Sequence, residues 1–268
     1  MEINILSILA CILYLIGGFM ASKQLQKSQQ TRSFKSACVV FTLIALTLHG
    51  VALSQVIFNE QGINLGFFNA ISFAAWCVVA LFLIASLFKP VTNLGIAILP
   101  IAGIAVLLGI NFDSTHLLPA GMAPGIKVHI VFSIMAYSLL SIAALQALLL
   151  SIQDHHLHAH HPGGFIRNLP PLETMEKLLF QMITAGFVLL SISLLSGVFF
   201  LEDIFAQHLV HKTALSIFAW VVFGTLLWGR TIFGWRGRVA IRWTLTGFVV
   251  LLLAYFGSKL VLELILNR

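Results

Sequence analysis

Four histidines stand in or beside long apolar runs, where an imidazole is an unusual side chain: His49, His129, His208 and His211. A neutral imidazole binds haem iron through its unprotonated ring nitrogen. An ionisable group at such a depth is a hypothesis for function by default. His49 and His129 also have a structural interpretation, in which each side chain bonds to a neighbouring helix or to lipid headgroups.

A second group of histidines forms the tract DHHLHAHHPGG, which holds His155, His156, His158, His160 and His161. His-rich tracts bind zinc, copper or nickel in some proteins. This tract has no cysteine partner and is bounded by Pro and Gly, so we interpret it as a solvated loop and place no metal there.

The sequence offers no catalytic constellation, so we do not expect an enzyme. Its cysteines, Cys11, Cys38 and Cys77, form neither C-x-x-C nor C-x-x-C-H, which excludes a dithiol carrier and a c-type cytochrome. No nucleophile–base pair, H-E-x-x-H helix or Walker loop is present.

The composition places the chain in a membrane. Apolar residues make up 59% and charged residues 9% of the 268 residues, and the mean hydropathy is +1.02. Soluble domains have about 45–50% apolar and about 25% charged residues. The net charge of +6 comes from basic residues that flank apolar runs. The positive-inside rule explains these residues without nucleic acid as a partner.

Spanning the hydrocarbon layer takes about 20 helical residues. Residues 1–268 are therefore expected to form one all-α membrane domain, without internal repeats, crossing the bilayer about eight times. The expected spans are 3–21, 36–58, 66–88, 93–112, 126–152, 176–200, 211–229 and 240–264.

Basic residues predict the orientation, because eleven of the fifteen follow the odd-numbered spans. Both termini are then periplasmic, and the four histidines fall in the outer half. His129 lies within about 5 Å of the outer boundary and His49 about 13 Å below it. Two axial ligands of one haem iron lie at one level, a condition that the expected depths of His49 and His129 do not meet.

Reporter fusions at Gly163 and Arg268 test this topology. We expect a cytoplasmic signal at Gly163 and a periplasmic signal at Arg268, because of the bias in basic residues. A periplasmic signal at Gly163 would overturn the orientation.

The turn GRTIFGWRGR carries three arginines, Arg230, Arg236 and Arg238, at the inner end of two spans. Arginine at this level binds lipid phosphates and tryptophan anchors at the interface.

Glu173 and Glu176 are expected in the first turn of the sixth span, where a carboxylate complements the helix dipole.

Several separated stretches resemble the cytochrome c assembly protein family, with its CcsA-like and HemX-like members, and in particular its YpjD-like inner-membrane branch. The resemblance covers about 40–265 and is most specific after residue 115. The matching stretches are KVHIVFSIMAYSLL, LPPLETMEKLLF, HKTALSIFAWVVFGTLLWGR, GWRGR and GFVVLLLAYFGSK.

The resemblance implies a bacterial inner-membrane protein that handles haem and works with cytochrome c maturation components. In the family, histidines flank a Trp-rich outer loop. His129 matches the histidine before that loop and His49 an early membrane histidine. The loop here, FFLEDIFAQHLVHKTA, has no Trp-rich motif. Trp228 and Lys259 stand where two further family histidines are expected.

The expected haem face therefore consists of His129 and His49, with His208 and His211 as substitutes for the missing post-loop histidine. Two alternatives stay open. One is a HemX-like protein that regulates a haem-pathway enzyme without binding haem. The other is a small-molecule transporter, although transporters usually show repeats and broken helices.

Overall fold

The computed structural model describes residues 2–26, 32–59, 62–112, 117–119, 123–158, 168–200, 207–257 and 259–260. Within these ranges, eight helices are long and apolar enough to cross a membrane. This confirms the predicted all-α, multi-pass membrane protein. Contacts group the chain into two compact units, the first containing α1–α4 and the second α5–α8.

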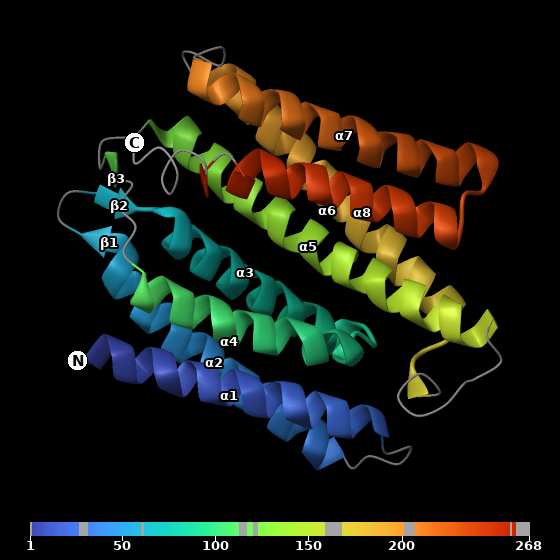
Figure 1. The fold of residues 1–268 in the computed structure, drawn as a ribbon, viewed down its shortest axis with the longest axis horizontal. Coiled ribbons are helices and arrows are strands. Elements are labelled where there is room, and N and C mark those ends of the chain that lie inside the picture. Colours follow the sequence, from blue (N-terminus) through green and yellow to red (C-terminus); the bar gives the residue numbers. More distant parts are fainter. Residues whose placement is uncertain are drawn as a thin grey trace. The chain divides into compact units, whose positions relative to one another are not determined.

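The first unit is a four-helix bundle in which α1 packs on α2 and α4, and α3 packs on both α4 and α2 (Figure 1). Its helices are α1 (Glu2–Gln26), α2 (Arg32–Ile57), α3 (Phe67–Phe88) and α4 (Gly95–Asn111), the last preceded by a 3-10 turn (Thr92–Leu94). Lys89 adopts an extended conformation, with φ −133° and ψ 150°, because the following Pro90 disfavours the helical region.

A short antiparallel sheet joins the loops of the first unit and was not predicted. Its strands are β1 (Phe58–Asn59), β2 (Gly62–Asn64) and β3 (Leu117–Pro119), in the order β1-β2-β3. Ile63 pairs with Phe58 on one side and with Leu118 on the other. The strands therefore tie the end of α2 to the segment that follows α4.

The second unit also has four helices, with α5 against α6 and α8, and α7 against α8 and α6. They are α5 (Pro124–His158), α6 (Leu172–Phe200), α7 (Gln207–Phe233) and α8 (Arg238–Leu252), which continues into a π-helical segment (Leu253–Gly257). α5 has 35 residues and exceeds the predicted span 126–152 at both ends.

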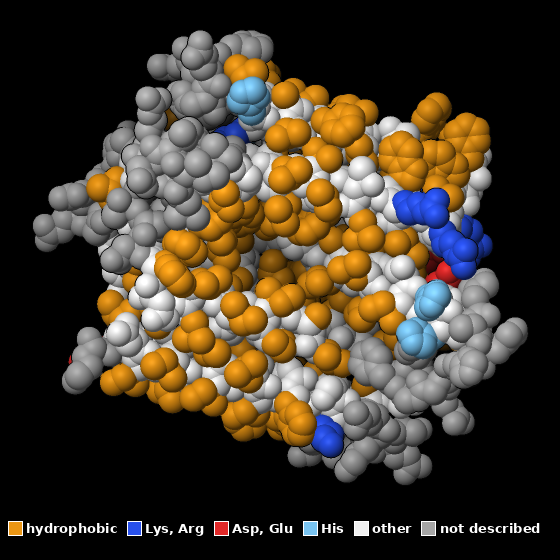
Figure 2. All heavy atoms as spheres, in the orientation of Figure 1, with side chains coloured by type: hydrophobic (Ala, Val, Ile, Leu, Met, Phe, Trp, Pro, Cys, Tyr) orange, Lys and Arg blue, Asp and Glu red, His pale blue; other side chains and the backbone are white. Residues whose placement is uncertain are grey.

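The helix surfaces suit a lipid environment. Large apolar side chains remain exposed on them, including Phe19 at 63% and Val198 at 61%. On the face shown in Figure 2, hydrophobic side chains cover the helices, whereas the Lys, Arg and His side chains lie near helix ends. Such a distribution is what lipid-facing helices require, because charged groups are costly in the hydrocarbon layer.

Candidate functional site

His129 lies near the start of α5 and is held by serines of α5 and α6. Its Nδ1 is 2.8 Å from the carbonyl oxygen of Ser193 and 3.3 Å from Oγ of Ser196. Its Nε2 is 3.5 Å from Oγ of Ser133, one turn along α5. Ser193 and Ser196 are buried, whereas His129 is partly exposed.

The hydrogen bonds around His129 determine its tautomer. A carbonyl oxygen only accepts, so Nδ1 donates to Ser193 and carries the proton of the neutral ring. Ser133 donates to the carbonyl of His129 at 2.6 Å, and Ser196 donates to that of Ser193 at 2.8 Å. The Ser133 and Ser193 hydroxyls lie 2.6 Å apart, and either of them can be the donor. Among the described contacts, the Nε2 of His129 has only the long one with Ser133, at 3.5 Å.

This arrangement fits an axial ligand. Histidines that bind a metal donate their other ring N–H to a carbonyl or carboxylate, which fixes the ring and raises its basicity. His129 satisfies this condition through Ser193. The ring is therefore oriented by Ser193, and its Nε2 is the nitrogen that could bind a metal.

His49 is placed differently, at the centre of the first unit. Its Nδ1 is 3.2 Å from the hydroxyl of Tyr14 on α1, and its Nε2 is 2.9 Å from Oγ of Ser72 on α3. His49 and Tyr14 are 0% exposed and Ser72 is 2% exposed. Both ring nitrogens are thus used within a hydroxyl–imidazole–hydroxyl chain that connects three helices.

The helices around His49 pack closely. Trp76 donates its indole N–H to the carbonyl of Leu46 at 2.9 Å and covers Gly50, where a Cβ atom would lie 2.9 Å from the indole nitrogen. A Cβ at Gly109 would lie 3.0 Å from Ser72. Ligation by His49 therefore requires breaking one of its two hydrogen bonds.

We expect His49→Ala to lower the free energy of unfolding by about 2–3 kcal/mol, from a buried cavity and two lost hydrogen bonds. Unfolding of the purified chain in mixed micelles measures this loss. Thr47→Ala, on the exposed face of α2, is the control and should change stability by less than about 0.5 kcal/mol. Equal effects of the two substitutions would contradict the structural role of His49.

The other predicted ligands are not brought to His129 by any contact among the described residues. His211 is exposed in the second turn of α7. The backbone of His208 is in α7, and its side chain lies outside the described residues.

The prediction that the His-rich tract forms a loop was wrong for its first members. His155 and His156 continue α5, and so does the backbone of His158. His156 donates Nδ1–H to the carbonyl of Ile152 at 2.9 Å. Within the described ranges, no three His, Cys, Asp or Glu side chains are grouped as a metal site would require. His160 and His161 lie outside those ranges.

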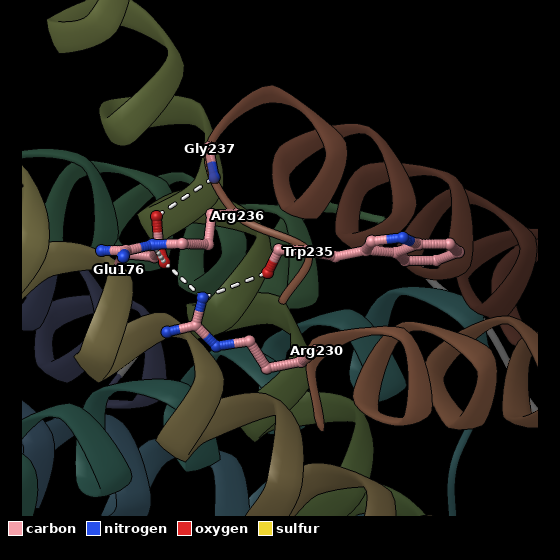
Figure 3. Close-up of polar contacts among 5 residues, drawn as sticks. All are labelled: Glu176, Arg230, Trp235, Arg236 and Gly237. Atoms are coloured by element: carbon pink, nitrogen blue, oxygen red, sulfur yellow. Dashed lines mark hydrogen bonds and ion pairs between the residues drawn. The ribbon is translucent and has the colours of Figure 1, made fainter. Parts of the chain in front are cut away.

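At the opposite end of the second unit, a polar cluster forms around Glu176 (Figure 3). Its Oε1 accepts from Nη1 of Arg230 at 2.9 Å and from Nε of Arg236 at 3.2 Å. Its Oε2 accepts from the backbone N–H of Gly237 at 3.1 Å. Arg230 also donates to the carbonyl of Trp235 at 3.1 Å. We call these five residues the Glu176 cluster. It fixes the α7–α8 turn to the start of α6.

The turn is built by its glycines. Gly234 and Gly237 adopt φ of +66° and +54°, a region that favours glycine. Gly229 lets the indole of Trp235 lie directly on α7, because a Cβ there would be 2.3 Å from the ring. Trp235 also packs on Trp243, with ring centroids 5.3 Å apart. The sequence therefore folds the turn back onto α7 and α8 and brings Arg236 to Glu176.

These contacts add to the interpretation of the arginine-rich turn. Its arginines were expected on lipid phosphates, and each also has a carboxylate partner; Arg238 pairs with Asp154 of α5 at 3.0 Å. The Glu176 carboxylate, expected to serve the helix dipole, accepts three side-chain and backbone donors instead. Two features of the sequence could have indicated the Glu176 cluster. One is a glutamate near the start of one helix, and the other is the set of arginines around Gly-Trp in a distant turn.

Comparisons with known proteins show which family this chain belongs to. The Cytochrome C assembly protein family profile matches residues 37–266. Inner membrane protein YpjD of Escherichia coli (strain K12) is 34% identical over 246 residues, which cover 88% of this chain and 90% of that protein.

More distant relatives include two proteins named Cytochrome c biogenesis protein CcsA. The one from Gloeothece citriformis is 21% identical, over 81% of this chain and 85% of its own length. The one from Mesostigma viride is also 21% identical, over 72% of each chain. Since the family profile spans most of the residues and YpjD covers nearly the whole length, this chain belongs to the cytochrome c assembly protein family.

Proposed function

We propose that this chain assists cytochrome c-type biogenesis in the bacterial inner membrane by holding haem at the outer face, with His129 as an axial ligand. Family membership and the names of the CcsA relatives support the biogenesis role. The name of the Escherichia coli relative supports the inner-membrane location. Haem is cargo in this proposal.

The observation that carries the proposal is the unequal hydrogen bonding of the two ring nitrogens of His129. Its Nδ1–H is committed to the Ser193 carbonyl at 2.8 Å, and its Nε2 has only a 3.5 Å contact with Ser133. A buried structural histidine usually has partners at both nitrogens, as His49 has. His129 instead has a short hydrogen bond at one ring nitrogen only, and the residue is partly exposed.

His49 contributes in a different way in this proposal. Both of its nitrogens are engaged, so it connects α1, α2 and α3 and stabilises the first unit. His211, together with His208, takes the place of the family's missing post-loop histidine, because the start of α7 and the start of α5 lie at the same end of the second unit (Figure 1).

Complementation of a host that lacks its own copy of this chain tests the function. We expect the wild-type chain to restore covalent cytochrome c haem, measured by in-gel peroxidase staining, and His129→Ala to restore less than about a tenth of it. The control replaces the His-rich tract (His155, His156, His158, His160 and His161) with serine and should restore wild-type levels.

Two results would contradict the proposal. The first is a cytochrome c content of the host that does not change when the chain is absent. If the levels of haem precursors change at the same time, the HemX-like regulatory alternative is favoured. The second is full restoration by His129→Ala together with failure of the tract variant, which would show that the tract is the functional site.

A further inference from the structure

We propose that the outward edges of Arg230 and Arg236 form a binding site for the phosphate of an anionic phospholipid headgroup. This inference rests on the Glu176 cluster alone and is independent of the haem proposal. Glu176 leaves one positive charge and several N–H donors of the two guanidinium groups available to such a ligand.

The charges in the cluster do not balance. Two guanidinium groups share one carboxylate, which leaves one positive charge in excess. The Glu176 side chain is 10% exposed, whereas Arg230 and Arg236 are 32% and 59% exposed. The negative charge is therefore inside the cluster, and the excess positive charge faces outward.

The donors do not balance either. A guanidinium group has five N–H donors and no acceptor. Among the described contacts, Arg236 uses only Nε, so both of its Nη groups are free of protein acceptors. Arg230 uses only Nη1, and its Cζ lies 4.6 Å above the ring of Phe180, which holds the guanidinium plane in place. Paired N–H groups of this kind match the oxygens of a phosphate.

The cluster lies at the ends of candidate membrane spans, where lipid phosphates are expected. The turn 234–237 separates two candidate membrane spans, Val210–Phe233 and Arg238–Gly257. Apolar side chains beside the turn are highly exposed, with Trp228 at 61% and Phe233 at 64%. Arginine above exposed aromatic side chains suits a phospholipid, whose acyl chains continue from the headgroup into the hydrocarbon layer.

The site is fixed before a lipid binds. Glu176 holds Arg230, Arg236 and the backbone of Gly237 from one side, and the indole of Trp235 points away from it (Figure 3). Because the guanidinium groups are already oriented, binding costs little side-chain entropy. In this description Glu176 orients the arginines, and the lipid neutralises the remaining charge.

Native mass spectrometry of the full chain, purified in mixed phosphatidylglycerol and phosphatidylcholine, tests the site. We expect phosphatidylglycerol to be enriched on the wild-type chain and Arg236→Gln to reduce this enrichment about fivefold, from one lost cation near the membrane surface. Lys89→Gln removes an exposed cation in the first unit and is the matched control, with a change below about twofold. Arg236→Lys keeps the charge and should retain more phosphatidylglycerol than Arg236→Gln.

Inorganic phosphate, added at the same concentration as the lipid, shows whether the site prefers the phosphate of a lipid headgroup or free phosphate. Phosphatidylglycerol that stays bound supports the lipid site, and its displacement by inorganic phosphate would overturn the lipid as ligand. Equal losses in Arg236→Gln and Lys89→Gln would also overturn it, because binding would then follow total charge alone. If Arg236→Gln fails to fold, Arg236→Lys is measured at raised ionic strength instead. Unchanged enrichment of phosphatidylglycerol would then support a fixed site, and complete loss of the enrichment would contradict a fixed site.

Discussion

His129→Ala is expected to raise the dissociation constant for haem at least tenfold, measured by following the Soret band of the purified chain during titration. The substitution removes the proposed ligand atom Nε2, whose one contact in the described part of the chain is the 3.5 Å approach of Ser133. Loss of a group that only orients a metal ligand already costs about 10–100-fold in affinity, and loss of the ligand itself costs at least as much.

Two comparisons make this expectation specific. Added imidazole should restore the Soret band of His129→Ala by occupying the vacated position. Ser133→Ala should bind haem nearly as well as wild type, because Ser133 is 3.5 Å from Nε2 and donates its proton to a carbonyl instead. An unchanged titration curve for His129→Ala would show that His129 is not a ligand.

Glu176→Ala is expected to lower the free energy of unfolding of the second unit by about 3 kcal/mol. The substitution leaves two guanidinium groups and the backbone N–H of Gly237 without their shared acceptor. Removing one partner of a buried ion pair costs about 3–5 kcal/mol, and the partial exposure of the arginines places this case at the lower end. Unfolding in mixed micelles, followed by tryptophan fluorescence, measures the loss.

Glu173→Ala is the matched control for Glu176, because it removes an exposed carboxylate from the first turn of the same helix. We expect a change of less than about 0.5 kcal/mol. If the two substitutions destabilise equally, the effect of Glu176 is that of a charge at a helix N-terminus and the cluster does not fix the turn.

The membrane spans could be predicted from the sequence because they depend on local hydropathy and length. The limits of α3 follow from its apolar run and from Pro90, and the structure ends this helix at Phe88. The pairing of Ile63 with Phe58 and Leu118 was not predictable in this way, because the strands are two or three residues long and one comes from a distant loop. The continuation of α5 to His158 was missed because histidines and aspartate are polar, and hydropathy marks only the apolar part of a helix.

The candidate site was only partly predictable. Residue type and membrane depth identified His129 and His49 equally well, but the difference between them lies in their partners. Ser193 acts through its backbone carbonyl and is 64 residues from His129, so no local pattern connects the two. Likewise, Arg236 is 60 residues from Glu176 and reaches it through two glycines with positive φ. Such tertiary contacts decide which nitrogen is free and which charge is paired.

The absorption spectrum of the purified wild-type chain, recorded with one equivalent of haem, tests the central claim most directly. We predict a Soret band shifted from that of free haem, saturating at one haem per chain, because the proposal makes Nε2 of His129, in a ring oriented by Ser193, a ligand of the iron. The same spectrum from His129→Ala should resemble free haem. A wild-type spectrum that is identical to free haem, or one that His129→Ala reproduces in full, would contradict haem handling at His129.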